Sequence, residues 1–154
     1  MKRFLKIILA TLLLLVAIIG YISWRYSQSS KNTSAFVEQL VTDVSKDWNP
    51  ETIKEHTHAL LAEQMAREGQ SWEDYFLIYR KLGALKSNTC KLLNYGSFAG
   101  LSGSYTRANF TCSAIYENGG ATINLSVQQA DHDGSWQVAV FHITSPMFIK
   151  ILQQ

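Results

Sequence analysis

An uncharged apolar run near the N-terminus constrains this chain more than any other feature. No charged residue occurs between Ile7 and Ile22, and the apolar stretch covers residues 4–24 if the side chain of Lys6 extends to the lipid head groups. A helix of that length is about 30 Å long, which matches the hydrocarbon core of a bilayer. The run predicts a transmembrane anchor, with the lipid bilayer as its partner over residues 4–24.

A cleaved signal peptide is the competing interpretation, because a basic segment precedes the run. Small residues normally mark a cleavage site, whereas this run ends in bulky side chains. Tyr21, Trp24 and Tyr26, with Arg25 among them, instead resemble the aromatic belt at the end of a retained helix. Because basic residues are concentrated before the run, the positive-inside rule places the N-terminus in the cytoplasm and the remaining chain outside it.

The rest of the chain is predicted to form one small domain. Residues 1–26 make the cytoplasmic stub and anchor, residues 27–33 a polar tether, residues 34–146 the domain, and residues 147–154 an apolar tail. With 47% hydrophobic and 17% charged residues, the composition excludes a disordered chain. After position 25 the chain has 10 basic and 12 acidic residues and no basic stripe, which argues against a nucleic-acid partner.

Three helices are expected in the first half of the domain. The first starts at Ser34, and the second starts at Asn49, which stands before a proline, and extends as far as Gly69. The third lies between Ser71 as N-cap and Gly83, which suits a left-handed C-terminal cap. Apolar residues recur at helical spacing in each, so each helix has one buried face.

Four strands are expected after the helices, because the apolar period changes to two from residue 84 onward. They cover residues 88–95, 105–116, 121–129 and 136–144. Asn118-Gly119 is a strong hairpin signal, and together the turn signals favour an antiparallel meander. Centring that hairpin on its turn pairs Cys112 with Leu125, and the next turn pairs Leu125 with His142. This register puts one apolar set and His142 on a single face: Phe110, Cys112, Ala114, Ile123, Leu125, Val127, Trp136, Val138 and Val140.

The two cysteines lie on the first two strands. If the intervening loop is centred at Leu101, Cys90 directly opposes Cys112. Directly opposed residues reach disulfide geometry most readily at a non-hydrogen-bonded pair, and a compartment outside the cytoplasm would oxidise the thiols. A disulfide is the favoured interpretation; two small buried hydrophobic residues are the alternative.

The order of elements and three short segments resemble small bacterial NTF2-like (cystatin-like) domains. The segments are Trp48-Asn49-Pro50, residues 79–86, and Gly134-Ser135-Trp136-Gln137-Val138, and the likeness covers about residues 34–145. The resemblance implies an α+β fold in which about three helices pack on a curved four-stranded antiparallel sheet, with a pocket between them. It also implies a bacterial inner-membrane protein with its domain in the periplasm, because exported NTF2-like domains serve as scaffold subunits of secretion channels.

Five residues are candidates for lining such a pocket. Asp47 lies beside the apolar stripe of the first helix, and Tyr75 and Tyr79 lie on the third helix. Trp136 and His142 belong to the apolar face of the last strand in the predicted register. An isomerase-like site needs a carboxylate base and a hydroxyl group, but nothing in the spacing of these residues requires that chemistry. We therefore expect no catalytic residues and no cofactor.

A metal site and a docking tail are the remaining candidates. Glu55 and His58 have a spacing that lets two side chains share a metal, but two ligands are too few, and we expect no metal. The apolar tail either packs on the domain or binds a partner. Its candidate partner-binding residues are Met147, Phe148, Ile149, Ile151 and Leu152.

Together these features predict a membrane-anchored, non-catalytic binding or assembly module outside the cytoplasmic membrane, which contacts an envelope protein or a second copy of itself. The alternative is a small-ligand-binding or isomerase-like pocket protein. A filled interior would favour assembly, and an open cavity with converging acidic, tyrosine and histidine side chains would favour chemistry.

Overall fold

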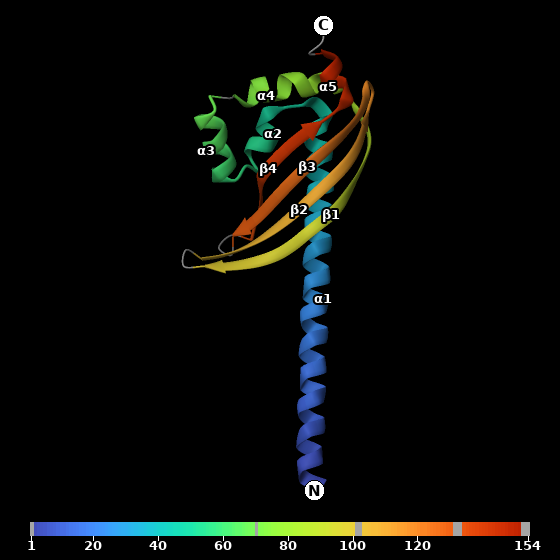
Figure 1. Ribbon diagram of the computed structural model, residues 1–154, viewed down its shortest axis with the longest axis vertical. Helices are drawn as coiled ribbons and strands as arrows, with labels where there is room; N and C mark the ends of the chain where they lie inside the picture. The colour runs from blue at the N-terminus through green and yellow to red at the C-terminus, as the bar shows by residue number, and fades with distance from the viewer. Residues whose placement is uncertain (1, 70, 101–102, 131–133, 152–154) are drawn as a thin grey trace. The chain divides into compact units, whose positions relative to one another are not determined.

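The computed structural model describes the backbone of residues 2–69, 71–100, 103–130 and 134–151, and the side chains of residues 11–69, 71–99, 103–129 and 134–148. Contacts divide the chain into two compact units, Met1–Asn32 and Thr33–Gln154. Helices come first and strands second (Figure 1). The elements are α1 (Lys2–Asp47), α2 (Pro50–Lys54), α3 (Ala59–Arg67), α4 (Trp72–Tyr79), a 3-10 helix (Arg80–Leu82), β1 (Leu85–Gly100), β2 (Gly103–Tyr116), β3 (Gly119–Ala130), β4 (Trp136–Thr144) and α5 (Pro146–Ile151).

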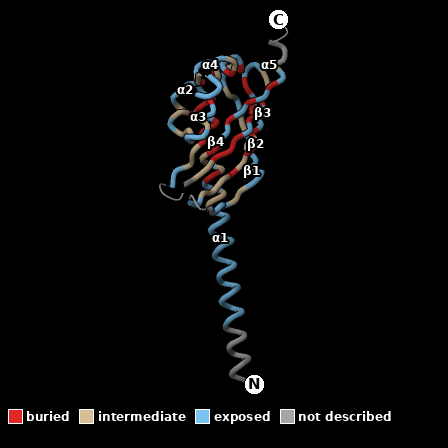
Figure 2. Tube along the Cα trace, turned by 60° about the vertical axis from the view of Figure 1, so that its left-hand side comes forward, coloured by how far each residue is buried: buried red, intermediate tan, exposed pale blue. Residues whose placement is uncertain are grey.

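The first unit contains the apolar run, and here the expectation of a transmembrane helix is wrong. Among the described residues, no helix is both long enough and apolar enough to cross a membrane. The described side chains of the expected span begin at Thr11, and from there to Trp24 a helix is about 21 Å long, against about 30 Å for a bilayer core. The side chains of residues 4–10 lie outside the described part. Residues 11–28 are exposed, and residues 27–33, expected as a tether, belong to α1 (Figure 2).

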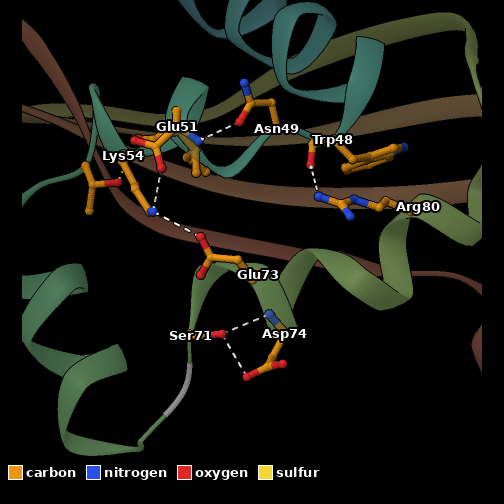
Figure 3. A network of polar contacts seen from close by, with 10 residues as sticks. Trp48, Asn49, Glu51, Lys54, Ser71, Glu73, Asp74 and Arg80 are labelled. Atoms are coloured by element: carbon orange, nitrogen blue, oxygen red, sulfur yellow. Dashed lines mark hydrogen bonds and ion pairs between the residues drawn. The ribbon is translucent and has the colours of Figure 1, made fainter.

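The second unit opens with the last part of α1, followed by a broken second helix. Asn49 caps α2 as expected, because its Oδ1 accepts a hydrogen bond from the Glu51 N–H at 3.1 Å (Figure 3). The helix expected to run to Gly69 is instead interrupted after Lys54. His58 then starts α3, since its Nδ1 accepts from the Leu60 N–H at 3.2 Å.

The break between α2 and α3 allows residues 56–58 to pair with β4. The Val138 N–H donates to the His56 carbonyl oxygen at 2.6 Å, and the His58 N–H donates to the Val138 carbonyl oxygen at 2.8 Å. Thr57 thereby forms a parallel bridge with Val138 on β4. A continuous helix would leave these edge groups of β4 without partners, so the tertiary pairing overrides the helical pattern.

The third helix has the ends that its sequence predicts. Ser71 Oγ accepts from the Asp74 N–H at 3.0 Å at the start of α4 (Figure 3). The 3-10 helix follows α4 and ends at Gly83, whose φ is 78°. Lys54 of α2 contacts Glu51 at 2.7 Å and Glu73 of α4 at 3.2 Å, so one ammonium group joins the two helices.

The sheet is the expected antiparallel meander, with strand order β1-β2-β3-β4 (Figure 1). Between β2 and β3 the register differs by two from the prediction, because Glu117 and Asn118 form the turn in place of Asn118-Gly119. Tyr116 therefore pairs with Gly119, and Cys112 pairs with Ile123. A shift of two residues keeps every side chain on the same face. The predicted apolar residues of both strands are accordingly buried.

The register between β3 and β4 corrects the prediction for His142. Ser126 pairs with Val140 and Val127 pairs with Val138, so Ala139 is an extra residue in β4, a β-bulge. The bulge inverts the alternation beyond it. Phe141 and Ile143 are buried, whereas Val140 and His142 are exposed and lie on the opposite face from the core.

The predicted disulfide between Cys90 and Cys112 is present. The two residues are paired directly across β1 and β2, and their Cα atoms are 4.0 Å apart, the short spacing of a non-hydrogen-bonded pair. Beyond Leu92 a bulge shifts the register by one, so the predicted pairing holds for the part of the hairpin that contains the cysteines.

Candidate functional site

The space between the helices and the sheet, where the predicted pocket would lie, is filled by aromatic rings. Trp48, at the end of α1, lies 6.0 Å from Phe76 and 5.5 Å from Tyr116 between ring centroids. Phe76 in turn lies 6.1 Å from Phe141 of β4. Three of these side chains are at most 3% exposed and Phe141 is 4% exposed. The rings take the place of a ligand cavity at this position.

The predicted pocket residues Tyr75 and Tyr79 are brought together, with ring centroids 5.2 Å apart, but their hydroxyl groups are used by the edge of the sheet. Tyr75 donates its O–H to the Phe141 carbonyl oxygen at 2.5 Å. Tyr79 hydrogen-bonds to the backbone of Ile143 and to Tyr75. Two residues along a strand and one turn along a helix both cover about 6 Å. Tyrosines one turn apart on α4 can therefore hydrogen-bond to alternate residues of β4.

Burial raises the pKa of both tyrosines. For Tyr75, desolvation is the largest cause and the hydrogen bond with Tyr79 adds to it. For Tyr79, desolvation raises the pKa, while the hydrogen bonds with Tyr75 and with the Ile143 backbone oppose the rise. Both hydroxyl groups therefore keep their protons at neutral pH. Tyr75 occupies the β4 edge as the donor to the Phe141 carbonyl oxygen, and Tyr79 occupies it through its hydrogen bond with the Ile143 backbone.

A groove of about 450 Å³ lies between α3, α4 and β4. Its apolar wall includes Met65, Trp72 and Phe141. Its ionisable side chains are Glu68, His142 and Tyr75, of which Tyr75 is hydrogen-bonded to the Phe141 carbonyl oxygen. A second, more open hollow of about 720 Å³ lies near the β2–β3 turn and α5. His142 lines both hollows, so the bulge that removes it from the core places it between two surface depressions.

The other predicted pocket residues are not brought to this groove. Asp47 is exposed, and its Oδ1 accepts from the Asn49 N–H at 3.1 Å, where it supports the link between α1 and α2. Trp136 is half-buried beside Tyr95, with ring centroids 6.4 Å apart. Of the predicted set, Tyr75 and His142 line the groove. Its acidic side chain is Glu68, which accepts a hydrogen bond from Gln64, and not Asp47.

The C-terminal tail begins on the domain. Met147 and Phe148 of α5 are half-buried against the core, and the Phe148 ring lies 5.6 Å from that of Tyr79. The side chains of Ile149 and Ile151, and all of Leu152, lie outside the described residues.

His58 of the Glu55–His58 pair serves as a helix cap, at the start of α3. The ring of the neighbouring His56 packs edge-on against Phe36 at 5.5 Å. Within the described ranges, no three side chains among His, Cys, Asp and Glu are close enough to hold a metal ion.

The outer face of the sheet, opposite the core, carries functional candidates that sequence reasoning missed. Outward side chains include Thr89, Lys91, Arg107, Thr111, Ser113, Thr122, Asn124, Ser126, Gln128, His142 and Thr144. Two of them have buried polar atoms without a hydrogen-bond partner, Nε of Arg107 and Oγ of Ser126. A signal was available in the sequence, because the strands contain basic residues and no Asp or Glu.

Comparison of the chain with models of protein families, with curated proteins and with solved structures found no match.

Proposed function

We propose that the protein is a non-catalytic binding or assembly module, built on an NTF2-like domain and acting in an oxidising compartment outside the cytoplasm. The filled interior is the observation that carries this proposal. Trp48, Phe76 and Tyr116 occupy the position between helices and sheet where a reaction pocket of that fold would lie. A core packed with rings leaves no room there for a substrate.

The chemistry of the polar groups supports the same proposal. General acid or base catalysis needs a group that exchanges a proton near neutral pH and reaches the substrate. The hydroxyl groups of Tyr75 and Tyr79 are bound to the β4 edge and have raised pKa values, and Asp47 faces solvent. These groups stabilise the fold and are not free to act on a ligand.

The disulfide supports the proposed compartment. Cys90 and Cys112 are joined within the sheet, and structural disulfides persist in oxidising compartments such as the periplasm. Assembly in an envelope complex, as in the exported domains that this fold resembles, is the form of binding that we propose.

The outer face supplies the surface for such binding. Its exposed residues are mostly small and polar, and they extend over all four strands, as with Thr89, Ser113, Thr122 and Thr144 in one row. Thr89, Ser113, Asn124 and Thr144 on this face are exposed. A broad, largely exposed sheet face suits a polypeptide partner better than a small molecule, which needs a concave site.

Site-specific photocrosslinking in cells tests the proposal. A photoreactive amino acid would replace Asn124, which is exposed on the outer face, and in a matched control would replace Glu63, which is exposed on α3. We expect position 124 to form an adduct with one polypeptide, a partner or a second copy, that position 63 does not form. The same adducts from both positions, or none from position 124, would contradict an assembly role for this face.

The groove beside α3 favours a second candidate, the binding of a small apolar ligand. Its volume of about 450 Å³ and its apolar wall, which includes Met65, are compatible with such a ligand. Methyl NMR with benzyl alcohol as the probe distinguishes the candidates. A saturable shift of the Met65 methyl resonance, without one at Met147 on α5, would favour ligand binding. Equal, non-saturating shifts would argue against it.

A further inference from the structure

The charged side chains of the four strands are all basic. Lys86, Lys91 and Arg107 lie within the four strand ranges, and those ranges contain no Asp or Glu. The acidic residues of the second unit's helical segments, such as Glu63 and Glu68, belong to the other layer of the domain. A basic side chain on the outer face therefore has no carboxylate from its own sheet.

Arg107 illustrates the consequence. Its Nη2 makes one long hydrogen bond, 3.4 Å, to Oε1 of Gln128 on the neighbouring strand. Its Nε is buried and has no hydrogen-bond partner, and within the described residues no carboxylate forms an ion pair with it. The Arg107 side chain is half-buried, and its Nη2 has an acceptor, so the energetic cost falls on the buried Nε, an orphan atom left without a hydrogen-bond partner.

Ser126 provides a second, independent orphan on the same face. The residue is 7% exposed, and its Oγ has no hydrogen-bond partner. Asn109 pairs with Ser126, and Arg107 pairs with Gln128, so Arg107 and Ser126 are diagonal neighbours on β2 and β3. Side chains in this relationship are within reach of each other when one of them is long.

The two orphan atoms select an acceptor with a negative charge. Arg107 Nε offers an N–H, and the Ser126 hydroxyl offers an O–H. A carboxylate has two oxygens that can accept both bonds and also neutralises the guanidinium. A water molecule could accept a hydrogen bond but would leave the charge unpaired.

We propose that Arg107 and Ser126, with Gln128 beside them, form a carboxylate-binding site that receives an acidic side chain of a partner polypeptide. We assign the carboxylate to a polypeptide because Arg107 and Ser126 lie on the outer sheet face and not among the residues that line the two grooves. This inference rests on the proposed function, and it names the chemistry by which the outer face recognises its partner.

The test uses the full-length ¹⁵N-labelled protein and follows the Nε–Hε resonance of Arg107. The probes are a hexaglutamate peptide, a hexaglutamine peptide and sodium acetate, at constant ionic strength. We expect hexaglutamate to give a saturable shift and hexaglutamine to give none, because only the former has side-chain carboxylates that can make a charge-assisted hydrogen bond. Acetate should require a concentration at least about tenfold higher, because it lacks the high effective concentration of several carboxylates on one chain.

Three variants separate the site from general charge attraction. Arg107→Gln should weaken hexaglutamate binding by about tenfold or more, and Ser126→Ala by about fivefold. Lys91→Gln is the matched control, since it removes the same charge from the same face two rows away from Arg107, and it should change binding less than about twofold. If Arg107→Gln does not fold, the shift of the wild-type Arg107 resonance and the hexaglutamate affinity of Ser126→Ala still test the site.

Several results would overturn the site. No saturable shift of the Arg107 resonance would exclude it, and equal losses in Arg107→Gln and Lys91→Gln would reduce it to non-specific attraction. Saturation by acetate at the same concentration as hexaglutamate would exclude the polypeptide source. If crosslinks form at position 124 while hexaglutamate does not bind, the assembly role survives and only the carboxylate site fails.

Discussion

The indole Nε1 of Trp48 donates a hydrogen bond to the carbonyl oxygen of Gly83 at 3.3 Å, and both residues have positive φ, 52° for Trp48 and 78° for Gly83. The bond joins the end of α1 to the chain just before β1. A tryptophan in this conformation is strained by about 1–2 kcal/mol relative to the right-handed region. Burial of the ring among Phe76, Tyr79 and Tyr116 offsets that cost.

Replacing Trp48 with phenylalanine should lower the free energy of unfolding by about 2–3 kcal/mol. The substitution removes part of a buried ring and leaves the Gly83 carbonyl oxygen without its donor. Urea denaturation followed by circular dichroism measures the change. Trp72→Phe, at a half-buried tryptophan of the groove, should cost less than half as much. Equal costs would show that the bond to Gly83 does not matter.

Gly83→Ala should be more destabilising than Gly69→Ala, although both glycines have similar φ, 78° and 65°. A Cβ at position 83 would lie 2.8 Å from Oε2 and 3.0 Å from Cβ of Glu117, whereas a Cβ at position 69 would have no neighbour within 4 Å. We expect a loss of about 1 kcal/mol at Gly69 from backbone strain alone, and more at Gly83. Matching thermal unfolding curves for the two variants would contradict this.

Alkaline pH should destabilise the domain through Tyr75 and Tyr79. Because burial raises their pKa values above the ordinary 10.0, the folded state holds protons that the unfolded state releases. The stabilisation is complete below pH 10 and is lost as the pH rises further. Urea unfolding from pH 8 to 11.5 should show this fall, and Tyr75→Phe should flatten it. An unchanged slope in the variant would exclude Tyr75 as a cause.

Tyr75→Phe should also cost about 1–2 kcal/mol at neutral pH, since the Phe141 carbonyl oxygen on the β4 edge loses its donor. The same urea series supplies this value at its lowest pH.

Reduction of the disulfide should lower the free energy of unfolding by about 3 kcal/mol, the chain-entropy estimate for a sequence separation of 22 residues. Urea unfolding of the wild type with and without dithiothreitol measures it. The Cys90→Ala, Cys112→Ala double variant is the control and should respond to neither condition. Identical wild-type curves with and without the reductant would contradict a stabilising role.

Phe141 and His142 should respond in opposite ways to truncation. Phe141→Ala removes a buried ring that packs on Phe76 and should cost about 3–5 kcal/mol. His142→Ala removes an exposed side chain and should stay within about 0.5 kcal/mol. The reverse order would mean that β4 has no bulge at Ala139.

Local signals in the sequence were sufficient where few residues decide the structure. Asn49, Ser71 and Gly83 act at helix ends as predicted, because a cap depends on one side chain or one φ angle. The opposition of Cys90 and Cys112 was also predicted, but the turn alone does not produce it. The bulge between Leu92 and Asn94 shifts the register by one and brings the two cysteines opposite each other.

Long-range requirements were not visible in the same way. The break before His58 depends on the edge of β4, which is 80 residues further along the chain, and no local residue marks it. The extra residue Ala139 likewise has no signal of its own, yet it moves His142 from the core to the surface. The candidate carboxylate site was missed because only the pairing of β2 with β3 brings Arg107 close to Ser126 and Gln128.

The closed edge of β4 limits how copies of this domain can associate. Residues 56–58 pair with Val138, and the tyrosine hydroxyl groups bind Phe141 and Ile143, so a further strand has no access on that side. Strand addition could take place at most along β1, and a chain that offers one such edge can join only one other. Sheet-to-sheet growth would therefore stop at a pair and could not propagate into a fibril.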